Sequence, residues 1–333
     1  MTSYSVGTIG AGAWGTALAQ AQAQAVEGGS SLLWAREQDV VDSINSVHEN
    51  TPFLPGVTLS ENLKATASME EVAQQDILLM VTPAQYMRAS LESFKPHIRK
   101  DQPVVICSKG IEIETGKLLV PVAQEVLGAK HPIAVMTGPT FASEIARNMP
   151  AAVTIAAKDE ALGKMLQQAL GAPKFRPYVS TDIVGAQLGG AVKNVIAIAA
   201  GIASGREMGD SARAALITRG LAETARLCVA MGGQRQTLLG MCGVGDLMLT
   251  CSSMQSRNCS LGTLLGQGQT LEQILESRNS VTEGIYTAQA VLKLAKQNAV
   301  EMPICQAVNA LLSGKMTIEE VIDDMLSRPF SER

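Results

Sequence analysis

The stretch of sequence that decides the fold reads Gly10-Ala11-Gly12-Ala13-Trp14-Gly15. It follows a short β-type run at residues 5–9, and it opens an Ala- and Gln-rich run of helical character at residues 15–26. A G-x-G-x-x-G pattern between a strand and a helix is typical of folds that bind a dinucleotide. The first glycine permits a tight turn, the second lets the backbone approach a pyrophosphate, and the third allows the helix to pack closely on the strand. We therefore predict a dinucleotide site at Gly10, Gly12 and Gly15, beside a helix N-terminus.

Strand-like and helix-like runs alternate through the first half of the chain. Further strands are predicted at residues 31–34, 77–81, 104–108 and 134–137, with a helix around 116–127 between the last two. This alternation predicts an α/β Rossmann-like domain with a mostly parallel, doubly wound sheet. Two shorter β-type runs, at 152–156 and 175–178, show no helix-length crossover, so we expect them to extend the sheet at an edge with antiparallel pairing.

The pattern changes near residue 181, because almost everything that follows has helical periodicity. Helices are predicted at residues 182–203, 212–231, 270–275, 287–297, 304–312 and 318–326. Ser211 and Thr317 are the expected N-caps, and Gly232-Gly233 is an expected helix stop. The sequence thus predicts a dinucleotide-binding Rossmann-like domain at 1–181 and an all-α substrate and catalytic domain at 182–333, joined through a helix.

The bulk properties exclude several classes of function. A chain of 333 residues with 46% hydrophobic residues can bury two cores, and a net charge of −4 gives no basic stripe for nucleic acid. The longest apolar run, 195–204, is about half the length of a membrane span. Residues 1–5 lack the basic and apolar pattern of a signal peptide. We expect a soluble, cytoplasmic protein without membrane insertion.

The cysteines and histidines do not predict a metal site. Six cysteines are scattered without a C-x-x-C pair, and the chain has only three histidines. Reduced thiols are the simplest interpretation of this pattern, and no bound metal is expected.

The residue that follows the second predicted strand bears on the choice between NAD and NADP. An acidic residue at that place would bind the ribose 2′-hydroxyl of NAD. Here Arg36 comes first and Glu37 only after it. A guanidinium suits a 2′-phosphate, so we favour NADP(H). The alternative is a solvated Arg36, with Glu37 reaching the ribose of NAD(H), and use of both cofactors is compatible with the sequence.

Lys193 is the strongest candidate for the chemistry of the second domain. It is the only charged residue between Asp182 and Arg206, in a helix that is otherwise apolar or small. Gly185, Gly189 and Gly190 disfavour that helix, which indicates close approach of a ligand or of another backbone. A protonated lysine in such a cleft could bind an anion or donate a proton to a carbonyl oxygen that is being reduced. The alternative is a lysine whose amine reaches the surface.

Several other polar segments are candidates for ligand contacts. Asp246 follows a glycine-rich turn at 243–245, and Ser256-Arg257-Asn258 offers adjacent donors suited to a phosphate or to hydroxyls. A solvated loop is the alternative for both segments. Lys109-Gly110 and the loop 138–142 follow predicted strands, where open α/β sheets bind their ligands.

Taken together, these segments resemble the NAD(P)-dependent glycerol-3-phosphate dehydrogenases. The resemblance runs from Ile9 to about Pro303, in the order of the family. Its motifs are Gly10-Ala-Gly-Ala-Trp-Gly-Thr-Ala-Leu, Ser108-Lys109-Gly110-Ile-Glu, Thr137-Gly138-Pro-Thr140-Phe-Ala, Gln187-Leu-Gly-Gly-Ala-Val-Lys193-Asn194-Val, Leu216-Ile-Thr-Arg219-Gly-Leu-Ala-Glu, Gly245-Asp246-Leu, Ser256-Arg257-Asn258 and Val281-Thr-Glu283-Gly284. The second domain resembles the helical domain of 6-phosphogluconate dehydrogenase and its relatives.

The resemblance implies roles for residues at matching positions. Lys193 would be the catalytic lysine, acting on the C2 oxygen of dihydroxyacetone phosphate. The residues expected around the substrate are Lys109, Gly138, Thr140, Lys193, Asp246, Ser256, Arg257 and Asn258. The residues expected along the cofactor, besides the glycines of the loop, are Trp14, Arg36, Lys109, Ala142, Arg257, Val281 and Glu283. Ala13 lacks the hydroxyl that some relatives carry, so no polar contact is assigned to it.

The resemblance also implies a reaction and a setting. The enzyme would interconvert dihydroxyacetone phosphate and sn-glycerol 3-phosphate by hydride transfer with NAD(P)H, as a homodimer, and would supply glycerol 3-phosphate for phospholipid synthesis. Lys193 would donate the proton, a neighbouring cation such as Lys109 would lower its pKa, and Asp246 would orient the ammonium or bind a substrate hydroxyl. Two other interpretations remain open: a related β-hydroxyacid or 6-phosphogluconate-type dehydrogenase, and a dinucleotide-sensing regulator without turnover.

Overall fold

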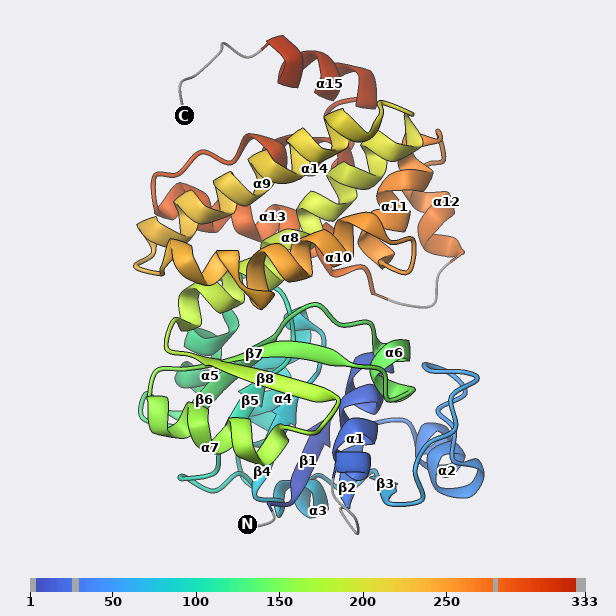
Figure 1. Cartoon of the computed structure of the whole chain (residues 1–333), viewed down its shortest axis with the longest axis vertical. Helices are drawn as coiled ribbons and strands as arrows, with labels where there is room; N and C mark the ends of the chain where they lie inside the picture. Colours follow the sequence, from blue (N-terminus) through green and yellow to red (C-terminus); the bar gives the residue numbers. More distant parts are fainter. Residues whose placement is uncertain (1–3, 26–29, 278–280, 328–333) are drawn as a thin grey trace. The chain divides into compact units, whose positions relative to one another are not determined.

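The computed structural model describes residues 4–25, 30–277 and 281–327 (Figure 1). The chain divides into an α/β unit, Met1–Lys109 with Leu118–Gln187, and a helical unit, Gly110–Lys117 with Leu188–Arg333. The change from one unit to the other after Gln187 lies inside a helix. No local sequence pattern indicates that Gly110–Lys117 packs with the helices of the second half.

One sheet forms the centre of the α/β unit. Among the described residues it has eight strands: β1 (Val6–Ile9), β2 (Ser31–Trp34), β3 (Leu63–Thr66), β4 (Ile77–Met80), β5 (Val104–Ile106), β6 (Ile133–Thr137), β7 (Ala151–Ala157) and β8 (Phe175–Ser180). Their order is β3-β2-β1-β4-β5-β6-β7-β8, and neighbouring strands are parallel except for β6 and β7. The predicted doubly wound sheet is therefore confirmed. Its strand order reverses between β1 and β4, where such sheets bind ligands at the carboxyl ends of the strands.

The central strands consist of apolar residues because helices cover both faces of the sheet. All residues of β1, β4 and β5 are buried. The helices of this unit are α1 (Ala13–Ala25), α2 (Gln38–Val47), α3 (Met69–Ala73), η1 (Ala84–Tyr86), α4 (Met87–Phe94), α5 (Leu119–Leu127), α6 (Ala142–Ala146) and α7 (Glu160–Leu170). Helix α1 is buried along residues 15–23, so its alanines and glutamines serve as core residues.

The structure differs from the prediction at several places in this unit. Strand β3 was not predicted, because Leu63–Thr66 is short and includes an exposed lysine. The expectation of no crossover helix before the last strand was wrong: α7 connects β7 to β8, and these two strands are parallel. The expected antiparallel pairing occurs between β6 and β7. Helix α1 begins two residues earlier than predicted, and the predicted Val26, like residues 1–3, lies outside the described residues.

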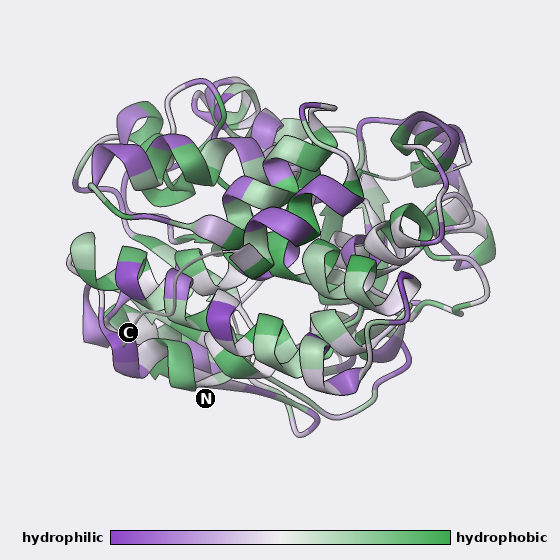
Figure 2. Cartoon of the chain, turned by 90° about the horizontal axis from the view of Figure 1, so that it is seen from above, coloured by the Kyte–Doolittle hydropathy of each residue, from purple (hydrophilic) through white to green (hydrophobic). Residues whose placement is uncertain are grey.

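The second unit contains helices. They are α8 (Ile183–Gly205), α9 (Asp210–Ala230), η2 (Arg235–Leu239), the π-helix η3 (Met241–Gly245), α10 (Asp246–Ser252), α11 (Arg257–Gly266), α12 (Leu271–Glu276), α13 (Glu283–Gln297), α14 (Pro303–Leu312) and α15 (Ile318–Ser327), of which the first five residues of α8 belong to the α/β unit. The long helices are confirmed, whereas α10 and α11 were not predicted. Coloured by hydropathy, most helices carry both hydrophobic and hydrophilic residues (Figure 2), as expected for amphipathic helices around a core.

The predicted helix boundaries have mixed outcomes. The Thr317 cap is confirmed, because its hydroxyl accepts a hydrogen bond from the backbone N–H of Glu320 at 3.2 Å. The Ser211 cap is wrong, because α9 begins at Asp210 with Gly209 as its N-cap. The predicted stop is confirmed, since Gly232 follows α9 with a φ of +81°.

Helix α8 packs so closely on its neighbours that glycines are required. A Cβ atom added at Gly201 would lie 2.1 Å from the carbonyl oxygen of Cys259 on α11, and one added at Gly189 would lie 2.2 Å from that of Cys242 on η3. Close backbone approach therefore explains Gly189. By length and composition α8 could also cross a membrane, but 89% of its most apolar window is buried inside the protein, as in the core helix of a folded protein.

Candidate active site

The loop between β1 and α1 has the geometry that its three glycines predict. Gly10 has a φ of +114°, which glycine adopts at no steric cost. A Cβ atom at Gly15 would lie 1.8 Å from the carbonyl oxygen of Gly10, so helix and turn touch there. A Cβ atom at Gly12 would meet nothing within 4 Å. The open side of the loop is thus at Gly12, where a ligand can approach the backbone and the N-terminus of α1.

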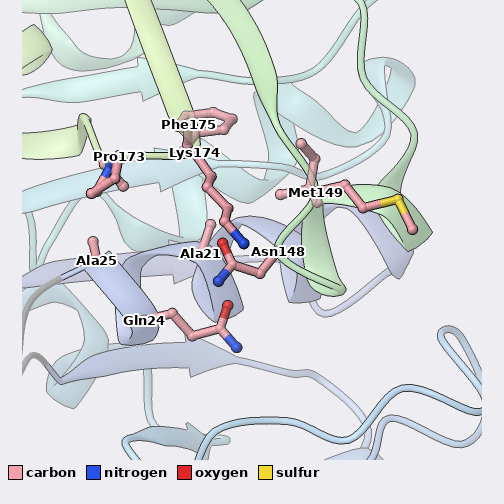
Figure 3. A pocket seen from close by; sticks show the side chains of 10 residues that line it. Ala21, Gln24, Ala25, Asn148, Met149, Pro173, Lys174 and Phe175 are labelled. Atoms are coloured by element: carbon pink, nitrogen blue, oxygen red, sulfur yellow. The ribbon is translucent and has the colours of Figure 1, made fainter.

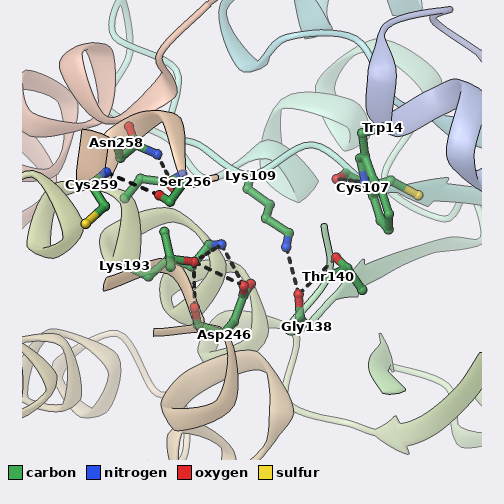
Figure 4. Close-up of polar contacts among 12 residues, drawn as sticks. Trp14, Cys107, Lys109, Gly138, Thr140, Lys193, Asp246, Ser256, Asn258 and Cys259 are labelled. Atoms are coloured by element: carbon green, nitrogen blue, oxygen red, sulfur yellow. Dashed lines mark hydrogen bonds and ion pairs between the residues drawn. The ribbon is translucent and has the colours of Figure 1, made fainter. Parts of the chain in front are cut away.

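Four of the predicted site residues of the α/β unit lie together beside this loop (Figure 4). The Lys109 amine donates a hydrogen bond to the carbonyl oxygen of Gly138 at 3.0 Å and lies 5.9 Å from the centroid of the Trp14 ring, within the range of a cation–π contact. The Thr140 hydroxyl donates to the same carbonyl oxygen at 3.2 Å. The indole N–H of Trp14 donates to the carbonyl oxygen of Cys107 at 3.3 Å. These contacts order a cation at the carboxyl ends of β5 and β6.

The strand ends explain why these side chains meet. Lys109 follows β5 and Gly138 follows β6, and the two strands are parallel neighbours, so their carboxyl ends lie at one edge of the sheet. Gly138 must be a glycine, because a Cβ atom there would lie 2.8 Å from the Cα atom of Val153 on β7. Ala142, a predicted cofactor residue, begins α6 and packs against the core of the unit.

Arg36 follows β2, on the other side of β1, and it has a partner. Its guanidinium donates two hydrogen bonds to one carboxylate oxygen of Glu37, at 2.7 and 3.0 Å. The side chains are 80% and 40% exposed, so solvent screens this ion pair and its free energy is small. The paired carboxylate is close enough to compete with a 2′-phosphate for the guanidinium and could itself accept from a ribose hydroxyl. Both cofactor interpretations therefore remain compatible with the geometry.

Lys193 lies in the middle of α8, and its amine points toward Asp246 (Figure 4). It donates hydrogen bonds to Oδ1 of Asp246 at 2.6 Å and to the hydroxyl of Thr250 at 2.8 Å. The Lys193 side chain is 8% exposed and that of Asp246 is 0% exposed. The alternative of an amine that reaches the surface is therefore wrong. The ion pair is compatible with Asp246 orienting the ammonium, one of the two roles predicted for it, and that role stays a prediction.

A buried ion pair of this kind needs a reason other than stability. Removing two charges from water costs several kcal/mol per ion, and their attraction roughly offsets that cost. Apolar residues of similar volume would stabilise the unit at least as well. A held but protonated amine can instead donate a proton to an oxygen that becomes negative, which is the chemistry of a general acid.

Ser256 and Asn258 do not lie in a solvated loop, and that alternative is wrong for them as well as for Asp246. The Ser256 hydroxyl caps α11 by accepting from the backbone N–H of Cys259 at 3.2 Å. The Asn258 amide donates to Oδ1 of Asn194 at 2.9 Å, and its own Oδ1 accepts from the backbone N–H of Gly284 at 3.0 Å. Asn258 thus joins α8, α11 and α13 directly beside Lys193.

Arg257 and Glu283 are the charged members of the predicted cofactor set in the helical unit. Arg257 as a whole is exposed, but the protein atoms around its guanidinium partly desolvate it and lower its pKa below the usual value, and the Glu283 carboxylate opposes that shift. Glu283 is the first residue of α13, where a carboxylate interacts favourably with the helix dipole. Val281 precedes that helix and is 37% exposed.

A pocket of the α/β unit lies beside the last turn of α1 (Figure 3). Its volume is about 150 Å³, and it is lined by Ala21, Gln24, Ala25, Ile145, Asn148, Met149, Ala172, Pro173, Lys174 and Phe175. Gln24 and Ala25 are in the last turn of α1, whereas the glycine loop precedes its first turn. None of the predicted site residues lines it, so we assign the chemistry to the residues above and not to this pocket.

The cysteines and possible metal ligands add no further site. All six cysteines are buried thiols. Within the described ranges, no three His, Cys, Asp or Glu side chains converge as metal ligands would.

Sequence reasoning missed Thr250. It accepts from Lys193, and its hydroxyl donates to the backbone carbonyl of Asp246 at 2.6 Å. The available signal was its spacing, because residues i and i+4 share a helix face. That signal depends on a helix beginning at Asp246, and the glycines at 243 and 245 concealed it.

Comparison with known proteins gives a consistent result over nearly the whole chain. The family model described as the N-terminus of NAD-dependent glycerol-3-phosphate dehydrogenase matches residues 5–163, and the one described as its C-terminus matches residues 182–323. The chain is 53% identical over 329 residues to the glycerol-3-phosphate dehydrogenase (NAD(P)+) of Caulobacter vibrioides, across 99% of this chain and 98% of that protein. It is 50% identical over 332 residues to the same-named protein of Maricaulis maris, across 99% of each. The crystal structure of glycerol-3-phosphate dehydrogenase from Coxiella burnetii superimposes with a TM-score of 0.92, at 36% identity, across 98% of this chain and 99% of that one.

Proposed function

Because the chain belongs to the NAD-dependent glycerol-3-phosphate dehydrogenase family, we propose that it interconverts dihydroxyacetone phosphate and sn-glycerol 3-phosphate with a nicotinamide dinucleotide. The observation that carries the proposal is the buried Lys193, the one charged residue of helix α8, in an ion pair with the buried Asp246 of α10. The enzyme is an oxidoreductase, and its fold provides the dinucleotide loop and the proton donor that this reaction requires.

The residues of the β1–α1 loop fit a dinucleotide. Gly12 leaves open space beside the backbone, and the first turn of α1 offers N–H groups and a positive dipole end. The reduced nicotinamide supplies the hydride when it is bound. The other cofactor contacts stay predictions. They are Trp14, Lys109 and Ala142 in the α/β unit and Arg257, Val281 and Glu283 in the helical unit.

We favour NADP(H) over NAD(H), because Arg36 is the first charged residue after β2. We expect the enzyme to use both cofactors. The guanidinium offers donors for a 2′-phosphate. Glu37 limits this preference, because its carboxylate already accepts from Arg36. A ratio of rates with the two cofactors, and not an all-or-none selection, is the expected behaviour.

Lys193 supplies the proton in the direction of reduction. When the substrate carbonyl carbon accepts the hydride, negative charge develops on the C2 oxygen, and an N–H proton of the ammonium is transferred to it. Asp246 and Thr250 hold the amine in one place, so little reorganisation is needed at the moment of reaction. In the oxidation direction the neutral amine takes the proton back.

The other predicted substrate contacts stay predictions. In the α/β unit they are Lys109, Gly138 and Thr140, which include a cation and a hydroxyl suited to an anionic substrate. In the helical unit they are Asp246, Ser256, Arg257 and Asn258. Of these, the Arg257 guanidinium is the group best suited to a phosphate, because it presents several N–H donors in a planar fork.

The wider setting is part of the same proposal. Residues 1–181 bind the dinucleotide, and residues 182–333 carry the proton donor. The protein acts in the cytoplasm as a homodimer, without nucleic acid and without membrane insertion. The glycerol 3-phosphate that it forms is used for phospholipid synthesis.

The reaction is tested by the loss of absorbance at 340 nm with dihydroxyacetone phosphate, run in parallel with NADPH and NADH. We expect the enzyme to oxidise NADPH and NADH, and NADPH faster than NADH. One molecule of glycerol 3-phosphate should form for each molecule of cofactor that is oxidised. No turnover with either cofactor, despite binding of both, would overturn the substrate assignment. A panel of β-hydroxyacids and 6-phosphogluconate would then distinguish the related dehydrogenases from a regulator that binds without turnover.

A further inference from the structure

Asn50 is a fully buried polar residue that touches the dinucleotide loop from the inside of the protein. It lies in the connection between α2 and β3, and its side chain is 0% exposed. Its amide nitrogen donates hydrogen bonds to the carbonyl oxygen of Ala11 at 2.8 Å and to the hydroxyl oxygen of Thr16 at 2.7 Å. Its Oδ1 accepts from the backbone N–H of Phe53 at 3.3 Å.

The contact with Ala11 fixes the direction of one peptide group. A trans peptide is planar, so the carbonyl of Ala11 and the N–H of Gly12 point in opposite directions. Asn50 holds the carbonyl toward the interior, and the Thr16 hydroxyl donates to the same oxygen at 3.4 Å. The N–H of Gly12 therefore points away from the interior, and a Cβ atom added at Gly12 would meet nothing within 4 Å, so the space beside this residue is open.

We propose that Asn50 is a positioning residue for cofactor binding, which acts by holding the Ala11–Gly12 peptide so that the Gly12 N–H faces the pyrophosphate. Thr16 supports the same peptide from the first turn of α1. The inference rests on the proposed function only in taking a dinucleotide as the ligand of this loop. Without Asn50 the peptide loses its anchor, and part of the binding free energy is spent on ordering it.

A second asparagine in the same unit provides a control that distinguishes an effect on the dinucleotide loop from a general loss of stability. Asn45 of α2 also holds a backbone group: its amide donates to the carbonyl oxygen of Ala65 at 2.8 Å, and its Oδ1 accepts from the backbone N–H of the same residue at 2.9 Å. Ala65 belongs to β3 and not to the loop. Asn45→Leu thus removes the same kind of hydrogen bond as Asn50→Leu, without a change at Ala11.

The experiment measures NADPH affinity by fluorescence titration of the full-length protein, together with its thermal unfolding. Asn50→Leu is expected to weaken NADPH binding about tenfold, because, of the hydrogen bonds that it removes, the one to the Ala11 carbonyl oxygen anchors the loop peptide. Asn45→Leu is expected to lower the Tm but to change NADPH affinity by less than about twofold, as no loop contact is lost. In turnover, Asn50→Leu should raise KM for NADPH more than it lowers kcat.

Thr16 variants keep the inference testable if Asn50→Leu does not fold. Thr16→Val removes the hydroxyl and should weaken NADPH binding, whereas Thr16→Ser keeps it and should restore the affinity of the native protein. Wild-type affinity in Asn50→Leu or Thr16→Val, or equal weakening in Asn45→Leu, overturns the role of Asn50. Asn50-dependent NADPH binding without turnover of dihydroxyacetone phosphate would overturn the proposed reaction and leave this inference intact.

Discussion

The dinucleotide loop of the α/β unit and the Lys193 cluster of the helical unit are built in opposite ways. The loop is a contiguous stretch, Gly10 to Gly15, and its function depends on backbone groups and on the absence of side chains. The cluster joins three side chains, Lys193, Asp246 and Thr250, from two helices that lie far apart in the sequence. The first should therefore be sensitive to an added methyl group, and the second to the loss of a charge or a hydroxyl.

The largest effect is expected for Lys193→Met, which removes the ammonium and its charge and leaves an unbranched side chain that is one atom shorter. Reduction should slow roughly 10³-fold, because the proton donor is absent. NADPH affinity should change by less than about twofold, since the glycine loop is untouched. Stopped-flow or steady-state assays at 340 nm and a fluorescence titration measure the two quantities.

The variant also leaves Asp246 buried without its cation, which costs about 3–5 kcal/mol. Lys193→Met/Asp246→Asn removes both charges and is the control for this loss of stability. A double variant that is folded, binds NADPH and still turns over at the wild-type kcat would contradict the role of Lys193.

The next largest effect compares two glycines of the loop. Gly15→Ala places a Cβ atom 1.8 Å from a backbone oxygen, so we expect the free energy of unfolding to fall by about 3 kcal/mol or more. Gly12→Ala meets no protein atom, so stability should change by less than about 1 kcal/mol, while NADPH affinity falls roughly tenfold. Thermal unfolding and NADPH titration separate the two effects. If Gly12→Ala binds NADPH normally, the pyrophosphate does not approach the loop at this residue.

The same contrast explains what could be predicted from the sequence. The loop and the strands around it are local patterns, so the glycine spacing and the apolar runs of β1, β4 and β5 were sufficient. Asp246 and Ser256 could be recognised as candidate ligand contacts. The sequence did not predict that both side chains are buried and lie at the start of helices. Helix α10 is only 7 residues long and follows a π-helix, so its periodicity is too short to detect. Its packing against the rest of the unit is long-range information that no local window contains.

A third prediction concerns the dependence of stability on pH. The glycine loop at residues 10–15 contains no titratable side chain, so we expect the pH dependence to arise in the helical unit and not in the loop. Glu223 of α9 is 3% exposed and accepts from the backbone N–H of Ile304 at the start of α14. Burial raises the pKa of its carboxyl from 4.5 to about 7, against the opposing effects of the Ile304 N–H and of Arg226 and Arg219. The folded state therefore binds the proton more tightly than the unfolded state. The stabilisation is complete below about pH 4.5 and is lost as the pH rises through 7.

The expected change in the free energy of unfolding is no more than about 3 kcal/mol. Glu223→Gln can still accept from Ile304 and has no proton to lose, so its stability should show a flatter dependence between pH 5 and pH 8. Thermal unfolding of both proteins across this range measures the difference. Parallel curves for the two proteins would show that Glu223 does not titrate there.

The smallest expected effect is at Arg36 and Glu37, where the α/β unit would recognise its cofactor through charged side chains and not through the backbone. Their ion pair is exposed and is worth at most about 1 kcal/mol, so its removal should change affinities by about fivefold or less. Glu37→Gln frees the guanidinium and removes a negative charge near the 2′-phosphate, so the ratio of kcat/KM for NADPH over NADH should rise. Arg36→Gln should lower that ratio, and higher salt should reduce both changes, because solvent ions screen exposed charges. If Glu37→Gln lowers NADH use without improving NADPH use, the carboxylate acts on the ribose of NADH and not on Arg36. In that case recognition of the adenosine ribose, unlike recognition of the pyrophosphate, depends on a side chain that the G-x-G-x-x-G pattern does not specify.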